Sequence, residues 1–230
     1  MSIDHIGIIL DGNRRFAKRL MMQPWKGHEY GINKVEKLFN WGKELGIKEL
    51  TLYVFSMQNF NRPQKEFDYL MKLFLEFFSN EMIKEKIYEN KIKIRFIGRT
   101  HLLPEEVYSK IIKLMDETKD YDDYIINFAM AYGGQEEVVD AVKMLIKDIK
   151  KNKINEDIID EELFENYLYL KSKPDLIIRT GGDHRTSNFL IWQSNYSEWF
   201  FLDKFWPEFE KEDLMKVIDE FNNRERRFGK

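Results

Sequence analysis

Short, continuously apolar runs alternate along the sequence with amphipathic segments of helical length, and this alternation restricts the fold more than any other feature. Six runs are predicted to be buried strands because their apolar residues are consecutive rather than alternating. Between most of them lie helical patterns, as in residues 31–45, 104–118 and 135–149. The pattern predicts an α/β fold with a central, mostly parallel six-stranded sheet flanked by helices. The predicted strands are residues 5–10, 49–55, 92–98, 124–130, 175–179 and 199–202.

Chain length and turn residues define the expected organisation. With 230 residues, 43% of them hydrophobic, the chain can bury one substantial core, and no repeat or linker divides it, so we expect a single domain over residues 1–230. Pro104 and Pro207 predict helix starts, and Gly46 predicts a helix end. Residues 67–83 carry apolar side chains on nearly every side of a helical wheel, which predicts a helix that is buried in the core or lines something apolar.

Composition excludes several classes of function. The net charge of −3 gives no overall positive field for nucleic acid, so an anion site must be built locally. The absence of cysteine rules out disulfides and thiolate metal sites and favours a reducing compartment such as the cytoplasm. A strand-like run that begins at Ile6 leaves no room for a signal peptide, and no apolar run approaches the roughly 18 residues that span a bilayer.

Polar, glycine-bearing and arginine-bearing segments follow the predicted strands. The first run is followed by "DGNRRF", the second by "SMQNFNRP" and the fifth by "RTGGDHRTSN". In an open parallel sheet, ligands bind beyond the carboxyl ends of the strands. A single loop arginine is usually an ion-pair partner at the surface, but here Arg15, Arg62, Arg179 and Arg185 gather at one predicted edge. Their guanidinium groups and the glycine pair at 181–182 predict one or two diphosphate sites.

Asp11 stands among these arginines. A carboxylate beside phosphate oxygens is repelled unless a cation lies between them, and Mg²⁺ is typically held by one or two carboxylates plus substrate phosphates. The alternative is that Asp11 caps the following helix. Asp183, His184 and Glu198 are candidates to complete a metal or proton-transfer shell, and His28 is a candidate proton carrier.

Motifs of other phosphate-binding families are missing. The sequence contains neither a G-x-x-x-x-G-K-[ST] loop nor a G-x-G-x-x-G turn. A phosphatase with an aspartyl nucleophile would have a second acid two residues after Asp11, where this chain has Asn13.

Six motifs together resemble the cis-prenyltransferases, and among them the bacterial undecaprenyl diphosphate synthases. They are "HIGIILDGNRRFA", "GHEYG", "LTLYVFSMQNFNRPQKEFDYLMKLF", "NFAMAYGG", "PDLIIRTGGDHRTSNFLIWQSNYSEWFF" and "NRERRFG", and they run in family order from residue 5 to 229. The resemblance implies a homodimer that condenses isopentenyl diphosphate repeatedly onto farnesyl diphosphate with Mg²⁺. The implied product is undecaprenyl diphosphate, the lipid carrier for cell-wall polysaccharides, made in the cytoplasm and released by transient contact with the inner face of the plasma membrane.

The resemblance also implies roles for residues at matching motif positions. The implied catalytic residues are Asp11, Asn13, His28, Ser56 and Asn59, and the implied metal residues are Asp11, His184 and Glu198. The implied substrate-binding residues are Gly12, Asn13, Arg14, Arg15, Phe16, Lys26, His28, Ser56, Asn59, Phe60, Arg62, Glu66, Arg179, Arg185, Ser187, Arg227 and Gly229. The resemblance implies that the allylic diphosphate is held by Gly12, Asn13, Arg15 and His28, and isopentenyl diphosphate by Arg179, Arg185 and Ser187. It also implies a flexible segment that closes over substrate, with Asn59, Arg62 and Glu66, and a terminal R-x-G, Arg227 and Gly229, that reaches the partner subunit's site.

This chain departs from the family at several of these positions. Phe16 and Phe60 stand where tryptophan is usual and keep an apolar surface, and Arg14 stands where glycine is usual. Pro24 replaces an arginine that commonly helps to hold the allylic diphosphate. We expect Arg14 or Lys26 to supply that missing charge.

A growing prenyl tail needs an apolar channel, because each buried CH₂ group is stabilised by about 0.8 kcal/mol. The apolar segment 67–83, with Ile32, Val35 and Val54, is the expected wall. The alternatives are a cis-prenyltransferase of another product length, a non-catalytic partner subunit of the same family, and a small phosphate-ester hydrolase.

Overall fold

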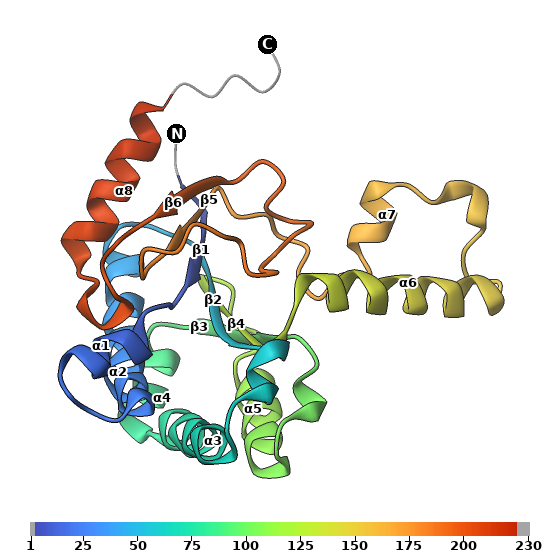
Figure 1. The fold of residues 1–230 in the computed structure, drawn as a ribbon. Coiled ribbons are helices and arrows are strands. Elements are labelled where there is room, and N and C mark those ends of the chain that lie inside the picture. Colours follow the sequence, from blue (N-terminus) through green and yellow to red (C-terminus); the bar gives the residue numbers. More distant parts are fainter. Residues whose placement is uncertain (1–2, 225–230) are drawn as a thin grey trace.

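The six predicted strands form one sheet in which every neighbouring pair is parallel (Figure 1). The computed structural model describes residues 3–224. The strand order is β3-β4-β2-β1-β5-β6, so β1 lies inside the sheet between β2 and β5. The predicted fold class is confirmed. The strands are β1 (His5–Ile9), β2 (Glu49–Ser56), β3 (Ile92–Ile97), β4 (Tyr124–Tyr132), β5 (Leu176–Arg179) and β6 (Glu198–Phe201).

The central strands are continuously apolar because both of their faces are buried. Ile6 and Ile8 of β1 belong to the large core between the sheet and the helices, whereas Ile9 joins a smaller cluster on the opposite face. Loop residues around Leu170 and Phe189 belong to that second cluster. The helices are α1 (Asn13–Arg19), α2 (Gly27–Glu44), α3 (Gln64–Ser79), α4 (Glu81–Glu89), α5 (Glu105–Glu117), α6 (Gly134–Lys150), α7 (Glu161–Glu165) and α8 (Lys211–Asn223). The short 3₁₀ segments are η1 (Pro24–Lys26), η2 (Met57–Asn61), η3 (Thr100–Leu102), η4 (Glu156–Ile158) and η5 (Trp206–Glu208).

Two of the three predicted helix boundaries are confirmed. Pro104 directly precedes α5, and Gly46 follows the end of α2 with a φ of 71° that suits glycine. Pro207 lies instead within η5, and α8 begins only at Lys211.

The prediction of one helix over residues 67–83 was wrong. α3 ends at Ser79, and Asn80 takes an extended conformation in which its side-chain oxygen accepts a hydrogen bond from the Met82 N–H, capping α4. α3 is also not apolar on all sides, because polar residues three or four positions apart form one exposed stripe. The stripe is hard to recognise on a helical wheel because the segment contains many phenylalanines. The exposed residues of that stripe are Lys65, Asp68, Lys72 and Glu76.

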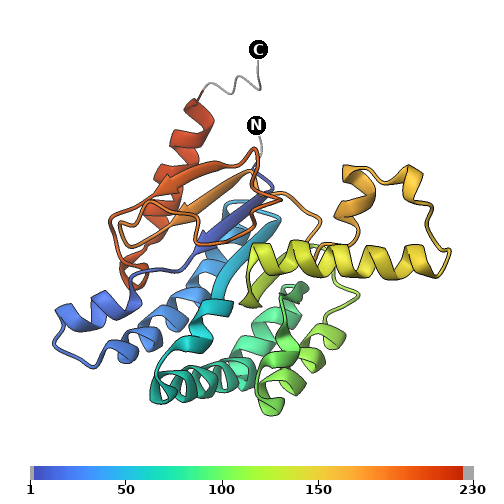
Figure 2. The same cartoon turned by 45° about the vertical axis from the view of Figure 1, so that its right-hand side comes forward.

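Two helical segments project from the body of sheet and core helices. α6 extends outward and carries α7 beside it, as both views show (Figures 1 and 2). α1 and η1 form a hairpin that extends beyond the carboxyl end of β1 (Figure 2). The loops that follow β1, β2 and β5 meet next to this hairpin.

Candidate active site

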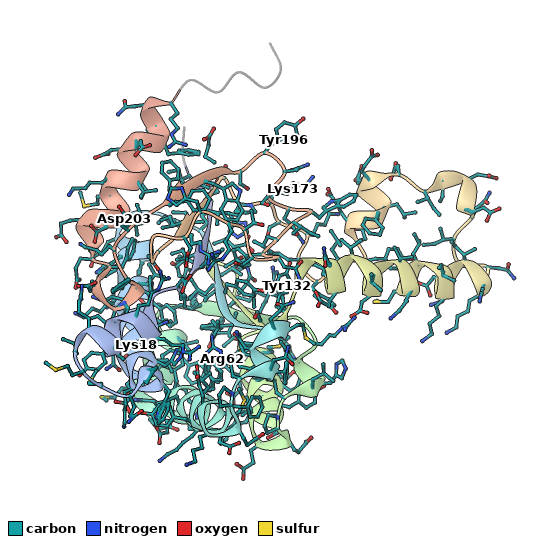
Figure 3. The ribbon with its side chains drawn as sticks, in the orientation of Figure 1. Lys18, Arg62, Tyr132, Lys173, Tyr196 and Asp203 are labelled. Carbon is teal, nitrogen blue, oxygen red and sulfur yellow. The ribbon has the colours of Figure 1, made fainter. Side chains whose placement is uncertain are left out.

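A cavity of about 600 Å³ lies at the carboxyl ends of β1, β2 and β5. Parallel strands bring these ends to one edge, so loops distant in sequence line it together. Figure 3 shows Lys18 and Arg62, both of which line the cavity, on the side of the molecule where α1 and α3 lie. The predicted residues that line it are Asp11, Gly12, Asn13, Arg14, Arg15, His28, Ser56, Asn59, Arg62, Arg179, Asp183, Arg185 and Ser187.

Asp11 is paired with two arginines. Its Oδ2 accepts a hydrogen bond of 2.7 Å from Arg179 Nη2, and its Oδ1 lies 3.3 Å from Arg15 Nη2. The Gly12 N–H also donates to Oδ1. Burial alone would raise the pKa of Asp11, but the hydrogen bonds from Arg179 and Gly12 and the charge of Arg15 outweigh burial and lower it. The carboxylate is therefore ionised at neutral pH.

Arg179 is the most buried cation of the site, with only 3% of the residue exposed. Its Nη1 donates to Ser187 Oγ and to the Arg185 carbonyl, both at 2.6 Å. Its Nε is buried and has no hydrogen-bond partner among the described residues. A buried guanidinium with an unused donor is suited to an anionic ligand.

The loop that carries Ser187 is fastened to the start of α6. Ser187 and Asn188 have φ values of 50° and 63°, a region that residues with side chains rarely adopt. The carbonyl of Asn188 accepts from the Gly134 N–H, and its side-chain oxygen accepts from the Gln135 N–H at 2.8 Å. These bonds use free amides at the helix start to hold the loop in its strained conformation.

A second cationic group surrounds Glu66, which is 2% exposed. Its Oε1 lies 3.0 Å from Arg62 Nη1, 3.6 Å from Arg14 Nε and 3.7 Å from His28 Nε2. These contacts outweigh burial and lower the pKa of Glu66. Burial, reinforced by the charges of Arg62 and Arg14, lowers the pKa of His28. Arg62 Nη1 lies 3.3 Å from His28 Nε2, a contact that requires an unprotonated nitrogen and agrees with a neutral imidazole.

Two glycines of "GHEYG" let α2 approach Asn13. A Cβ at Gly27 would lie 1.9 Å from the Asn13 carbonyl oxygen, and one at Gly31 would lie 2.3 Å from Asn13 Oδ1. Asn13 Nδ2 donates to the Leu10 carbonyl, whereas its Oδ1 is buried and accepts no hydrogen bond from the described residues. The short motif therefore sets the position of a polar side chain at the cavity wall.

Ser56 and Asn59 fix the loop after β2. The Ser56 N–H donates to Asn59 Oδ1 at 2.9 Å, and the Ser56 side chain accepts in return from the backbone of Asn59. This capping box holds the turn from which Arg62 reaches the cavity. The structure therefore supports a positioning role for both residues, and their implied catalytic role stays a prediction.

The inner part of the cavity is apolar. Ile32, Val35 and Val54, the expected channel residues, line it together with Leu70 and Phe74 of α3. The cavity thus has charged walls at the strand ends and an apolar wall formed by α2, α3 and β2.

Several predicted residues lie outside the cavity lining. Phe16 packs on Tyr30 and Phe60 packs on Phe55, each as an aromatic pair. Lys26 forms an ion pair with a glutamate of α2 and does not line the cavity, so of the two candidates to compensate for Pro24 only Arg14 does. Glu66 is also outside the lining and forms ion pairs with Arg62 and Arg14, which do line the cavity. Arg227 and Gly229 lie outside the described residues.

The predicted metal residues do not converge within residues 3–224 of one chain. The ring of His184 stacks on Phe201 with centroids 4.9 Å apart. Glu198 begins β6 and accepts a hydrogen bond from Arg224 Nη1, away from the carboxyl end of its strand. No group of three His, Cys, Asp or Glu residues in this part of the chain is placed to hold a metal ion. Of the candidate metal residues, Asp11 and Asp183 line the cavity, whereas His184 and Glu198 do not.

Sequence reasoning missed Lys18, which also lines the cavity. It lies one helical turn after Arg14 and Arg15 on α1, so a helical wheel started at Asn13 would have placed these three cations on neighbouring positions.

The sequence of this chain matches one protein family over nearly its whole length. Residues 9–229 match the family described as "Putative undecaprenyl diphosphate synthase". The chain therefore belongs to this family of cis-prenyltransferases, as the six sequence motifs had indicated.

Two archaeal proteins are among the relatives that this chain resembles in sequence. The chain is 47% identical to the tritrans,polycis-undecaprenyl-diphosphate synthase (geranylgeranyl-diphosphate specific) of Methanopyrus kandleri, over 99% of this chain and 84% of that protein. It is 44% identical to the protein of the same name from Methanocaldococcus jannaschii, over 98% of this chain and 82% of that protein.

Two solved structures share the fold. Lavandulyl diphosphate synthase from Lavandula x intermedia, in complex with dimethylallyl diphosphate, has a TM-score of 0.95 and 33% identity and covers 100% of this chain and 99% of that chain. A probable undecaprenyl diphosphate synthase from Campylobacter jejuni has a TM-score of 0.82 and 31% identity, with 100% of both chains covered.

Proposed function

We propose that the protein is a chain-elongating cis-prenyltransferase, which joins isopentenyl diphosphate repeatedly to an allylic prenyl diphosphate. One observation carries the proposal: two separate cationic groups and an apolar wall share one cavity. Two diphosphates need two anion subsites, and a prenyl tail needs apolar surroundings.

The two cationic groups suit the two substrates. Arg179, Arg185 and Ser187 form the proposed pocket for isopentenyl diphosphate, in which Arg185 is the more exposed guanidinium group. Arg62 and Arg14 form the proposed pocket for the allylic diphosphate, next to the apolar wall that would receive its tail.

The proposed reaction is an electrophilic condensation. The allylic C–O bond breaks and its electron pair leaves with the diphosphate, while the alkene of isopentenyl diphosphate attacks the allylic carbon and one proton is lost. Negative charge therefore grows on the leaving diphosphate. Fixed guanidinium groups stabilise that charge without reorganising, which is a major source of catalysis in preorganised sites.

Magnesium fits this donor set if the substrates supply most of its ligands. Asp11 is ionised, lines the cavity and is surrounded by the groups that would bind phosphate oxygens. Mg²⁺ is commonly held by one or two carboxylates together with substrate phosphates. We propose Asp11 as its protein ligand, where the ion would neutralise charge on the diphosphate.

The allylic substrate is proposed from the relatives. The sequence predicts farnesyl diphosphate by family resemblance, whereas the archaeal relatives carry "geranylgeranyl-diphosphate specific" in their names. We propose geranylgeranyl diphosphate as the starter and a product of undecaprenyl length that carries sugars. Their identity of 44–47% to this chain supports this choice over farnesyl diphosphate.

Purified protein incubated with labelled isopentenyl diphosphate, Mg²⁺ and one allylic diphosphate at a time tests the proposal. The starters compared are dimethylallyl, farnesyl and geranylgeranyl diphosphate. We expect long products, with the highest kcat/KM for geranylgeranyl diphosphate. A product that stops after a single condensation would contradict repeated chain elongation. No incorporation from any starter, or release of inorganic phosphate alone, would refute the proposal.

A homodimer is also proposed. α6 exposes an apolar stripe formed by Val139, Val142 and Ile146, each more than a third exposed, and Ile191 nearby is 41% exposed. Such a stripe on a projecting helix suits a second copy of the chain. Light scattering coupled to size exclusion should show a dimer, and Val142→Asp should weaken it.

Contact with a membrane follows from the product rather than from a spanning segment. No helix within residues 3–224 is long and apolar enough to cross a bilayer. A long polyprenyl tail is unfavourable in water, so we propose that the protein works in the cytoplasm and releases its product at the inner face of the plasma membrane.

A further inference from the structure

The hairpin between α1 and α2 ends in exposed apolar side chains. Residues 20–25, which we call the α1–α2 tip, read Leu-Met-Met-Gln-Pro-Trp. Met21 is 96% exposed, the largest value among the exposed large hydrophobic residues of the described chain, and Leu20 is 47% exposed. Met22 and Trp25 are partly buried. An apolar side chain held this far into solvent suggests a ligand outside the protein.

The backbone of the tip makes Met21 more unusual. The Met22 N–H donates to the Ala17 carbonyl and the Met21 N–H to the Lys18 carbonyl, the pattern of a Schellman helix end. Met21 occupies the left-handed position of this motif with a φ of 56°, where glycine is preferred. A side chain there costs roughly 1 kcal/mol relative to glycine, yet the position holds a large apolar residue that contacts little of its own protein.

Basic residues border the tip. Residues 14–30 contain five basic side chains and one acidic one, Glu29, whereas the whole chain has a net charge of −3. Arg19 forms an ion pair with Glu208, and Lys26 forms one with Glu29. The side chains of Arg19 and Lys26 are each about half exposed. Such exposed pairs contribute at most about 1 kcal/mol, so phosphate headgroups can compete for the cations.

The tip also adjoins the cavity. Arg14, Arg15 and Lys18 of α1 line the cavity, and Leu20 and Met21 directly follow the end of the same helix. A surface that held the tip would therefore lie close to the cavity.

We propose that the α1–α2 tip docks the protein on an anionic lipid bilayer, with Leu20 and Met21 entering the interface and the flanking cations contacting headgroup phosphates. Apolar chains beside basic ones are the combination that binds such a surface. An interface between two copies would bring the basic residues of both together, which like charges oppose. The purpose of docking, delivery of an apolar product, rests on the proposed function, but the docking itself does not.

Met21→Gly tests the proposal without endangering the fold. Glycine relieves the left-handed conformation, so the melting temperature should stay the same or rise. Binding of the full chain to vesicles of phosphatidylcholine and phosphatidylglycerol, measured by flotation without substrate, should fall about tenfold. Met82→Ser, at another exposed methionine on α4, is the matched control and should bind as the unmodified protein does.

The charge contribution has its own matched pair. Arg19→Gln should weaken binding to the anionic vesicles several-fold, and Lys147→Gln on the projecting helix α6 should not. Added salt should weaken binding of the unmodified protein, and vesicles of phosphatidylcholine alone should bind it poorly.

Two results would overturn the proposal. The first is that Met21→Gly binds vesicles as tightly as the unmodified protein does. The second is that Met21→Gly changes the oligomeric state of the protein and leaves vesicle binding unchanged. If vesicles are bound but no starter is elongated, the proposed function fails and the docking stands. If elongation occurs, vesicles should accelerate turnover of the unmodified protein more than that of Met21→Gly, with equal rates in their absence.

Discussion

Replacing Asp11 by asparagine should strengthen diphosphate binding in the absence of Mg²⁺ and weaken it, relative to the unmodified protein, in its presence. Asparagine keeps an oxygen for the Gly12 N–H, so the turn after β1 should persist. It removes the negative charge that lies 2.7 Å, atom to atom, from Arg179. Without Mg²⁺ the variant should bind inorganic diphosphate more tightly than the unmodified protein, because the carboxylate no longer repels the ligand.

The size of this gain follows from Coulomb's law. A carboxylate about 5 Å from a phosphate group repels it by about 3 kcal/mol at an effective dielectric constant of about 20. The Asp11 side chain is 31% exposed, and the cavity admits water, so we reduce this to about 1 kcal/mol, or roughly fivefold in affinity. With Mg²⁺ the order should invert, because the unmodified protein gains a ligand for the ion and the variant does not.

Isothermal titration with inorganic diphosphate, in chelator and in Mg²⁺, measures both halves of the prediction. Asp183→Asn is the matched control, since Asp183 lines the same cavity and also pairs with Arg15. It should bind diphosphate more tightly in chelator and keep the gain from Mg²⁺. If Asp11→Asn gains as much from Mg²⁺ as the unmodified protein does, Asp11 does not hold the ion and our reasoning is wrong.

Three further changes test the supports of the site. Gly27→Ala places a Cβ 1.9 Å from the Asn13 carbonyl, so the free energy of unfolding should fall by about 1–3 kcal/mol in urea titrations; an unchanged midpoint would contradict the close packing. Asn188→Ala removes the side-chain bond between the Ser187 loop and the Gln135 N–H but keeps the backbone bond to Gly134, so KM should rise several-fold for isopentenyl diphosphate but not for the allylic substrate, and equal rises would speak against a positioning role. Burial lowers the pKa of His28 below its ordinary 6.5, so as the pH falls below 6.5 the unfolded chain takes up a proton before the folded chain does, and the free energy of unfolding declines. His28→Gln should make this decline shallower, by at most about 1.4 kcal/mol per pH unit. Parallel curves of unfolding free energy against pH for the two proteins would refute the prediction.

The sequence was sufficient for the sheet because strand and loop signals are local. Each buried strand is a short apolar run, and the polar segments that follow these runs are the ones that line the cavity. The edge rule for parallel sheets then brings Asp11 and Arg179 together without any knowledge of strand order. The sequence could not show that Arg179 Nε has no hydrogen-bond partner in the described chain, or that Glu66 is buried against Arg62, because both features depend on how the loops pack together.

The wrong prediction of a single helix over residues 67–83 has an equally local cause. A helical wheel of residues 67–83 shows only which residues share a face, so it could not indicate the helix break at Asn80. The break depends on one hydrogen bond, from the Met82 N–H to the Asn80 side chain. Phe60 was assigned to substrate binding on family resemblance alone; its ring packs against Phe55 and Phe67, and the assigned role stays a prediction. Glu198 was assigned to a metal through the resemblance alone; it begins β6 and accepts a hydrogen bond from Arg224, and its metal role stays a prediction.

The position of β1 inside the sheet affects how the chain is made. Ile6 of β1 pairs with Leu176 of β5, so one edge of the first strand has no partner until most of the polypeptide has left the ribosome. Such long-range parallel pairing folds slowly and leaves an edge open to other chains. Because Asp11 and Arg179 meet only when that gap closes, diphosphate binding is acquired at the end of synthesis, and truncated chains should neither bind the ligand nor stay in solution.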